Sequence, residues 1–327
     1  MHPAFSVIFL TTLIGAGQGL FIALFSIESL GLLGMAPLQN GDFFALGSLV
    51  SLVLLGLGLF SSFFHLGRPE RAWRSATKWR TSWLSREVIV LPAFMGVVCL
   101  YGIAHWTGFN PTLGTLAGGH GVLTTVVLGV LGTVLALALY VSTAMIYAAV
   151  KFLQEWHSPL TVVNYTVLGA ASGFTLATAY AAWAGAPLVQ VLASTAIVLT
   201  LLGLLTRVAS LIRNARIKPK STLQTAIGIK HPRIQQKSQG FMGGSFNTRE
   251  FFHHRSEGFV RTMKWLFLIA AFAIPTLLLA VSLLMTVDAT NLLLAAFLIQ
   301  YLGLLAERWF FFAQANHPQN LYYQSVA

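Results

Sequence analysis

Long apolar runs alternate with short polar breaks along the whole chain. A run of about 20 apolar residues spans the hydrocarbon core of a bilayer as a helix, and in lipid the backbone polar groups must be satisfied within that helix. The strict alternation of a membrane β-barrel is missing. The pattern predicts an all-α membrane protein, a bundle of eight transmembrane helices in one domain over residues 1–327, with helices at 4–34, 43–66, 87–107, 119–150, 160–183, 188–212, 260–286 and 291–313.

Composition supports this fold class. Hydrophobic residues make up 56% of the chain, charged residues only 9%, and the mean hydropathy is +0.74. The first apolar run begins close to Met1 without a charged leader or a small-residue cleavage site. We therefore expect this run to be a retained helix and not a signal peptide.

The charges are distributed asymmetrically about the predicted helices. All 20 Lys and Arg residues fall on one side, whereas the other side holds only Glu28, Asp42 and Asp288. The positive-inside rule then places both termini and every basic loop in the cytoplasm. We expect contacts with membrane lipid and with protein partners, and none with nucleic acid.

One polar connection is much longer than the others. Residues 213–258 are too polar to span a membrane, and long connections without structure of their own are often functional. The part "FMGGSFNTREFF" interleaves aromatic residues with glycine and polar residues, which favours a docking segment over a solvated tether.

The stretch "HLGRPERAWRSATKWRTSWLSREV", residues 65–88, combines basic, aromatic and titratable side chains between two apolar runs. Pro69 predicts the start of a short surface helix over 69–84, with its tryptophans at the membrane interface. His65 and Glu87 stand at the cytoplasmic ends of consecutive spans. Glu307 and Arg308 end the last span at the same level.

Ionisable groups at membrane depth are functional candidates. An imidazole beside carboxylates can transfer protons near neutral pH, which a quinone site requires because two electrons are coupled to two protons. The structural alternative is that Glu307 and Arg308 anchor a helix end, and that the basic residues between Arg68 and Arg80 reach lipid headgroups.

Metal and haem sites are not favoured by the pattern. Cys99 is the only cysteine, so the chain cannot ligate an iron–sulfur cluster, which takes four. His105 and His120 are the nearest to a haem-binding pair, but both fall near the outer end of a hairpin. Glu28, in the outer half of the first span, could serve a proton path or a hydrogen bond between helices.

Four blocks of the sequence together resemble the dimethyl sulfoxide reductase anchor-subunit family, the DmsC-like membrane subunits, and the similarity covers essentially the whole chain. They are "MHPAFSVIFLTTLIGAGQGL", "HLGRPERAWRSATKWRTSWLSREV", "GFMGGSFNTREFFHH" and "AERWFFFAQANHPQNLYY". The resemblance implies an eight-helix, quinone-reactive anchor without haem. It also implies an iron–sulfur partner with four [4Fe-4S] clusters and a catalytic partner with molybdenum bis-guanine-dinucleotide, in a heterotrimer or a dimer of it. In the family, positions matching His65 and Glu87 are linked to quinol binding.

Two branches of this resemblance run electrons in opposite directions. Dimethyl sulfoxide reductases oxidise menaquinol and hold their catalytic subunits outside the cytoplasm, whereas quinone-linked sulfite dehydrogenases work on the cytoplasmic side and reduce the quinone. The basic side also carries His65 and Glu87, so the sulfite branch is favoured, in a bacterial inner membrane. A reductase anchor is the alternative, and a secondary transporter is a distant one because polar groups gather at one face and not at the midplane.

Roles follow for the candidate residues. We expect His65 to donate a proton to ubiquinone or menaquinone or to bind its carbonyl, and Glu87 to relay protons. The remaining candidates would stabilise a partly reduced quinone or contact the partner: Arg68, Arg71, Arg86, Glu307 and Arg308. Partner docking is expected through 67–86, 213–258 and the C-terminal tail.

Overall fold

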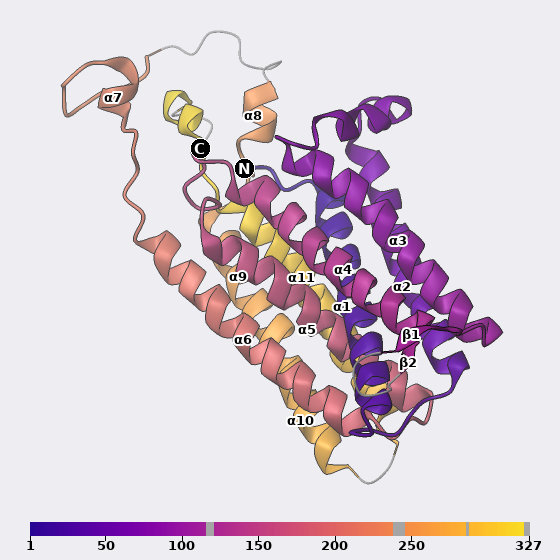
Figure 1. Ribbon diagram of the computed structural model, residues 1–327. Helices are drawn as coiled ribbons and strands as arrows, with labels where there is room; N and C mark the ends of the chain where they lie inside the picture. The colour runs from indigo at the N-terminus through magenta and orange to yellow at the C-terminus, as the bar shows by residue number, and fades with distance from the viewer. Residues whose placement is uncertain (116–120, 238–245, 286–287, 324–327) are drawn as a thin grey trace.

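The computed structural model describes residues 1–115, 121–237, 246–285 and 288–323. Within these residues, eight helices are long and apolar enough to cross a membrane, which confirms the predicted number. They lie side by side in one bundle, with both chain ends at the same end of it (Figure 1). Their bounds are α1 Phe5–Leu32, α2 Gly41–Ser62, α3 Trp83–Thr107, α4 Thr124–Ala148, α5 Pro159–Trp183, α6 Val189–Ala215, the continuous α9, η3 and α10 from Glu257 to Leu284, and α11 Thr290–Ala313.

Helices α1 and α5 form the centre of the bundle and are the most buried of the eight in the described chain. Helix α1 packs against α2, α4, α5 and α11, and α5 packs against α1, α4, α6 and α11. Glycines allow the two central helices to approach closely: a Cβ atom on Gly173 would lie 2.2 Å from the carbonyl carbon of Gly19. The glycines of "GAGQG" therefore serve helix packing, as in other membrane bundles.

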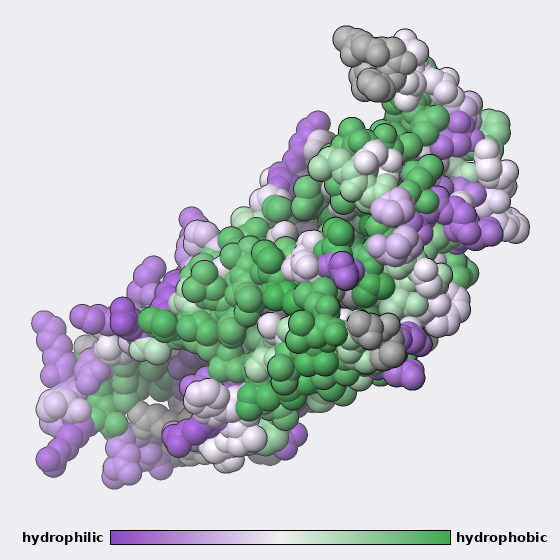
Figure 2. All heavy atoms as spheres, turned by 90° about the horizontal axis from the view of Figure 1, so that it is seen from below, coloured by the Kyte–Doolittle hydropathy of each residue, from purple (hydrophilic) through white to green (hydrophobic). Residues whose placement is uncertain are grey.

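The surface has the polarity expected of a spanning bundle. In Figure 2, apolar side chains cover the middle of the visible face and hydrophilic ones gather toward its two ends. Every Lys and Arg of the chain lies at or near the end that carries the termini, because each basic segment connects helices there or lies in the adjoining turns. We call this end the basic end.

The connection after α2 differs from the predicted surface helix. A short 3₁₀ turn, η1 (Phe63–His65), ends α2, and a 3₁₀ helix, η2, covers only Pro69–Lys78. Ser82 then caps α3 by accepting a hydrogen bond from Ser85 N at 3.3 Å, so Trp83 belongs to the transmembrane helix. The Ser85 hydroxyl donates back to the Ser75 carbonyl and holds η2 against α3.

Two further local features escaped prediction. At the end opposite the basic end, Thr112–Thr115 (β1) pairs antiparallel with Gly121–Leu123 (β2), so α4 begins at Thr124 and not near 119. Helix α9 (Glu257–Leu268) continues through one π-helical segment, η3 (Ile269–Ala273), into α10 (Ile274–Leu284). The π segment lies just before Pro275, where the missing N–H interrupts the regular hydrogen bonding.

The described parts of the 213–258 segment pack against the C-terminal tail of the chain itself. They contain α7 (Leu223–Ile227) and α8 (Phe246–Glu250), and the tail contains a 3₁₀ helix, η4 (Pro318–Tyr322). The Phe251 ring stacks on His317 with centroids 3.8 Å apart, and Tyr322 OH donates to Ala226 O at 2.8 Å. Segment and tail thus form one surface at the basic end.

Candidate functional site

Glu87 lies within the first two turns of α3 and points into the bundle. Its side chain is buried, with 8% exposed, although it is close to the basic end. Thr143 of α4 donates a 2.5 Å hydrogen bond from its hydroxyl to Glu87 Oε1. A buried carboxylate that reaches a second helix through a hydroxyl is a polar site built by packing, not by local sequence.

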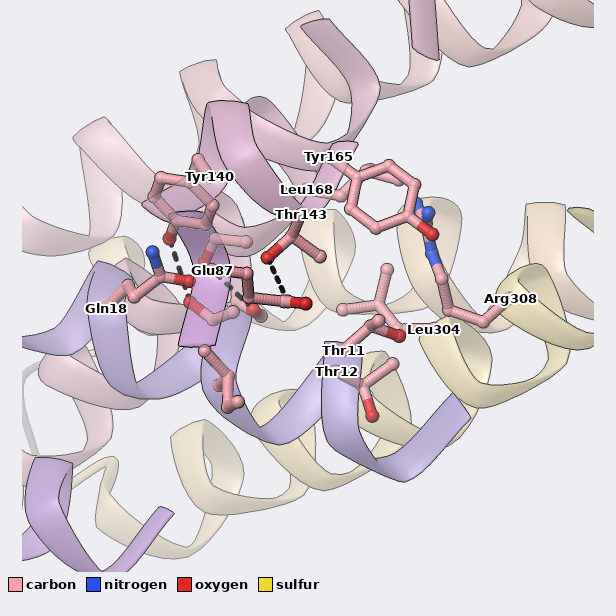
Figure 3. Close-up of a pocket in the computed structure, with 14 residues that line it drawn as sticks. Thr11, Thr12, Gln18, Glu87, Tyr140, Thr143, Tyr165, Leu168, Leu304 and Arg308 are labelled. Atoms are coloured by element: carbon pink, nitrogen blue, oxygen red, sulfur yellow. Dashed lines mark hydrogen bonds between the residues drawn. The ribbon is translucent and has the colours of Figure 1, made fainter. Parts of the chain in front are cut away.

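A small cavity surrounds this carboxylate, and we call it the Glu87 cavity. It has a volume of about 30 Å³, which is room for about two water molecules. Figure 3 shows Glu87 and Thr143 pointing into it between α1, α4 and α5, with Tyr165 and Arg308 on the far side.

Helix packing fixes the polar groups that α1 and α4 contribute to the wall of this cavity. Tyr140 OH donates to Gly15 O at 2.8 Å, and Gln18 Nε2 donates to Ala136 O at 2.8 Å. These bonds join α1 to α4. Among the described residues that line the cavity, Glu87 is the only acidic one.

Three charged side chains beside this cavity form an ion cluster: Arg207 of α6 with Glu307 and Arg308 of α11. Arg207 Nε lies 2.6 Å from Glu307 Oε1, and Arg308 Nε lies 2.7 Å from Glu307 Oε2. All three are buried, with at most 4% exposed. The Arg308 guanidinium also lies over the Tyr165 ring, 3.9 Å from its centroid, a favourable cation–π arrangement.

A second cavity lies on the other side of the ion cluster, toward the basic end, and we call it the rim cavity. It has a volume of about 10 Å³, enough for about one water molecule. Glu155, Arg213 and Asn214, half-buried side chains from the α4–α5 connection and the last residues of α6, line its outer part. Tyr165 and Arg308 line both cavities.

The structure divides the predicted site residues into two groups. Glu87, Glu307 and Arg308 come together inside the bundle. His65, Arg68 and Arg71 are exposed at the basic end, and His65 lines neither cavity.

Arg86 differs from these exposed residues, because its side chain binds carbonyl groups of the chain just after η2. It donates to Trp79 O at 3.0 Å and to Arg80 O at 2.9 Å. Its guanidinium also lies 4.0 Å from the centroid of the Trp83 ring.

Sequence reasoning missed Arg207, Thr143 and Tyr165 as members of the site. An arginine inside the apolar run "LGLLTRVASL" was a usable signal, because a charge at membrane depth needs a partner. Thr143 and Tyr165 gave no such signal, because hydroxyl side chains are common in membrane helices and only packing selects these two.

A second buried polar group lies toward the opposite end of the bundle. Tyr101 OH donates to Glu28 Oε2 at 2.7 Å, and His105 Nε2 lies 3.4 Å from Glu28 Oε1. Of the two roles considered for Glu28, the hydrogen bond between helices is therefore present. His120, the other histidine weighed for haem, lies outside the described residues.

No three His, Cys, Asp or Glu side chains come together to hold a metal ion within the described ranges. The titratable groups of the site are instead paired with guanidinium or hydroxyl groups. Such an arrangement can hold water and transfer protons between fixed positions.

The fold and this site define a multi-pass membrane protein with buried polar and charged side chains near one face. Residues 1–323 match the family model of the DMSO reductase anchor subunit (DmsC), so the chain belongs to that family. It is also 58% identical, over all 327 residues and the full length of the relative, to the C subunit of the sulfite dehydrogenase of Allochromatium vinosum. The chain is thus a membrane anchor subunit of a molybdoenzyme complex, as the resemblance implied.

Proposed function

We propose that this chain is the quinone-reactive anchor of a sulfite-oxidising molybdoenzyme complex in a bacterial inner membrane. A four-cluster iron–sulfur subunit would dock at the basic end, through 67–86, 213–258 and the C-terminal tail. A molybdenum subunit would oxidise sulfite with water to sulfate, and the two electrons would reach a quinone at this end of the anchor. The observation that carries the proposal is the 58% identity, over the full length of both chains, to a subunit of a sulfite dehydrogenase.

The orientation of the complex is part of the proposal. All 20 basic residues gather with the termini, and the positive-inside rule places that end in the cytoplasm. Removing the nine Lys and Arg residues of the long 213–258 segment from the 20 leaves 11 on the same side and none on the other.

The residues at the basic end fit a quinone in two different ways. His65 is exposed at the end of α2, where an imidazole can meet a carbonyl oxygen at the membrane boundary. The Glu87 cavity, at about 30 Å³, is about ten times smaller than a typical small-molecule pocket. Glu87 therefore fits the role of proton relay, and not direct contact with a quinone ring.

When bound, the quinone accepts two electrons and two protons to become a quinol. His65 would bind the quinone carbonyl from the exposed end of α2 and donate a proton to it. Arg68 and Arg71 are exposed beside it in sequence and would supply positive charge to the quinone or to the partner. Glu307 and Arg308 would act from within the bundle, through the ion cluster.

The test is His65→Ala in the assembled three-subunit complex. Because a positioned proton donor contributes about 10²-fold or more, sulfite-dependent quinone reduction should fall by about that factor. Sulfite oxidation with a water-soluble artificial acceptor, and assembly, should be unchanged. His2→Ala is the matched control, because His2 is an exposed histidine at the same end and lies outside the segments proposed to dock the partner.

Loss of assembly in His65→Ala would make the residue structural. Unchanged quinone reduction would refute a quinone site at this position. The family description, a DMSO reductase anchor, favours a second candidate function: quinol oxidation for an S-oxide or N-oxide. In that case electrons run in the opposite direction and the basic end faces outward.

A further inference from the structure

The Glu87 cavity, the ion cluster and the rim cavity follow one another from the bundle interior toward the basic end. Tyr165 and Arg308 line both cavities, so the two spaces meet at this pair of side chains. Their volumes, about 30 and 10 Å³, correspond to about two waters and one water.

Several buried polar atoms of the ion cluster and the rim cavity have no hydrogen-bond partner in the described protein. Arg207 Nη2 and Arg308 Nη1 are buried without a hydrogen-bond partner, as is Asn164 Oδ1 at the rim cavity. Buried polar groups are almost always satisfied, and an internal water is the usual solution where there is room for one. The two cavities lie beside these groups and have room for water.

Protonation of Glu87 changes the formal charge of the set formed by Glu87 and the ion cluster. With Glu87 ionised, the two guanidinium groups of the ion cluster are balanced by the carboxylates of Glu87 and Glu307. A proton on Glu87 leaves one net positive charge in the buried set, and its release restores the balance. Glu87 binds the Thr143 hydroxyl and forms no ion pair among those of the described residues, so its carboxyl group can exchange a proton with water in the cavity.

We propose that the rim cavity, the ion cluster and the Glu87 cavity form the proton route that supplies quinone reduction from the basic end. The inference rests on the proposed function. A proton enters from water between Glu155 and Arg213, crosses past Tyr165 and Arg308, and protonates the Glu87 carboxylate. Glu87 then releases it toward His65, which donates it to the quinone oxygen. Two such transfers balance the two electrons that come from sulfite through the partner.

Two nearly isosteric variants test the route in the complete complex. Tyr165→Phe removes the hydroxyl that both cavities share but keeps the ring under Arg308. Thr143→Val removes the hydrogen bond to Glu87. Thr175→Val is the matched control, because Thr175 is also buried, lies in α5, donates to Ala171 O of its own helix, and lines neither cavity.

We expect the maximal rate of sulfite-dependent quinone reduction to fall about ten-fold or more in both variants, since each interrupts proton transfer. The KM for quinone and the rate with an artificial acceptor should be unchanged. The rate ratio between H2O and D2O should rise in the two variants and stay at the wild-type value in Thr175→Val.

Wild-type quinone reduction and an unchanged isotope ratio in both variants would overturn the route. Loss of assembly in both, with Thr175→Val intact, would also overturn it, because the groups would then be structural. If only the proton route is wrong, His65→Ala still loses quinone reduction. If the proposed function is wrong, His65→Ala keeps full quinone reduction.

Discussion

Arg207 of α6 and Glu307 of α11 form a buried ion pair, with Nε and Oε1 2.6 Å apart and both side chains nearly inaccessible. The two residues come from helices separated by the whole 213–258 segment. Arg308 shares the same carboxylate, so one acidic group holds two guanidinium groups inside the bundle.

Glu307→Gln should destabilise the anchor strongly. The change leaves two buried positive charges with less compensation, and breaking a buried pair in this way lowers the free energy of unfolding by about 3–5 kcal/mol. Thermal unfolding of the detergent-solubilised protein measures the effect.

The matched control for that change is Glu70→Gln. It breaks the exposed Glu70–Arg71 pair at 3.7 Å and should change stability by less than about 1 kcal/mol. Equal stability of the two variants would contradict a structural role for the ion cluster.

Gly173→Ala should weaken the central α1–α5 contact. The new methyl group would lie 2.2 Å from the Gly19 backbone, and overpacking of this kind lowers the free energy of unfolding by about 1–3 kcal/mol. Gly56→Ala adds the same methyl group in α2 where nothing lies within 4 Å, so its melting temperature should stay near the wild-type value. If both variants melted together, the close approach would not limit packing.

The C-terminal tail should leave its site as the pH falls. Burial, and secondarily the nearby N-terminal ammonium, lowers the pKa of His317 below its ordinary value near 6.5. Protonation therefore favours the undocked tail: docking is strongest above about pH 6.5 and weakens as the pH falls through that value. Hydrogen exchange of η4, corrected for the intrinsic pH effect, should rise at about pH 5.5, while exchange in α5 stays constant.

Asn320→Ala provides an independent check on the tail. Its amide donates to Phe251 O at 3.0 Å, so the variant should raise η4 exchange at every pH and leave the pH dependence in place. Protection in the unmodified protein that does not change with pH would refute a role for His317 protonation.

The orientation predicts the behaviour of reporter fusions. An enzyme active only outside the cytoplasm should be inactive at the C-terminus and active when inserted between α1 and α2, near Gly34. The physical reason is that every Lys and Arg gathers at the end with the termini. The opposite result would reverse the electron flow proposed here and favour a reductase anchor.

Hydropathy was sufficient for the eight helices, because the length of an apolar run and the thickness of a bilayer are both local quantities. The location of the basic residues on one side and the resemblance to the DmsC-like anchors could also be recognised from the sequence alone. The sequence likewise identified Glu87, Glu307 and Arg308 as unusual, since charges at membrane depth are rare.

Tertiary packing decided which of these groups meet. Neither the pairing of Glu307 with Arg207 nor the bond from Thr143 to Glu87 follows from spacing along the chain. Both depend on how α3, α4, α6 and α11 are rotated about a central α1–α5 pair whose separation is set by glycine contacts. The separation of exposed His65 from buried Glu87 has the same origin, because the rotation of a helix decides which of its side chains face the interior and which face outward.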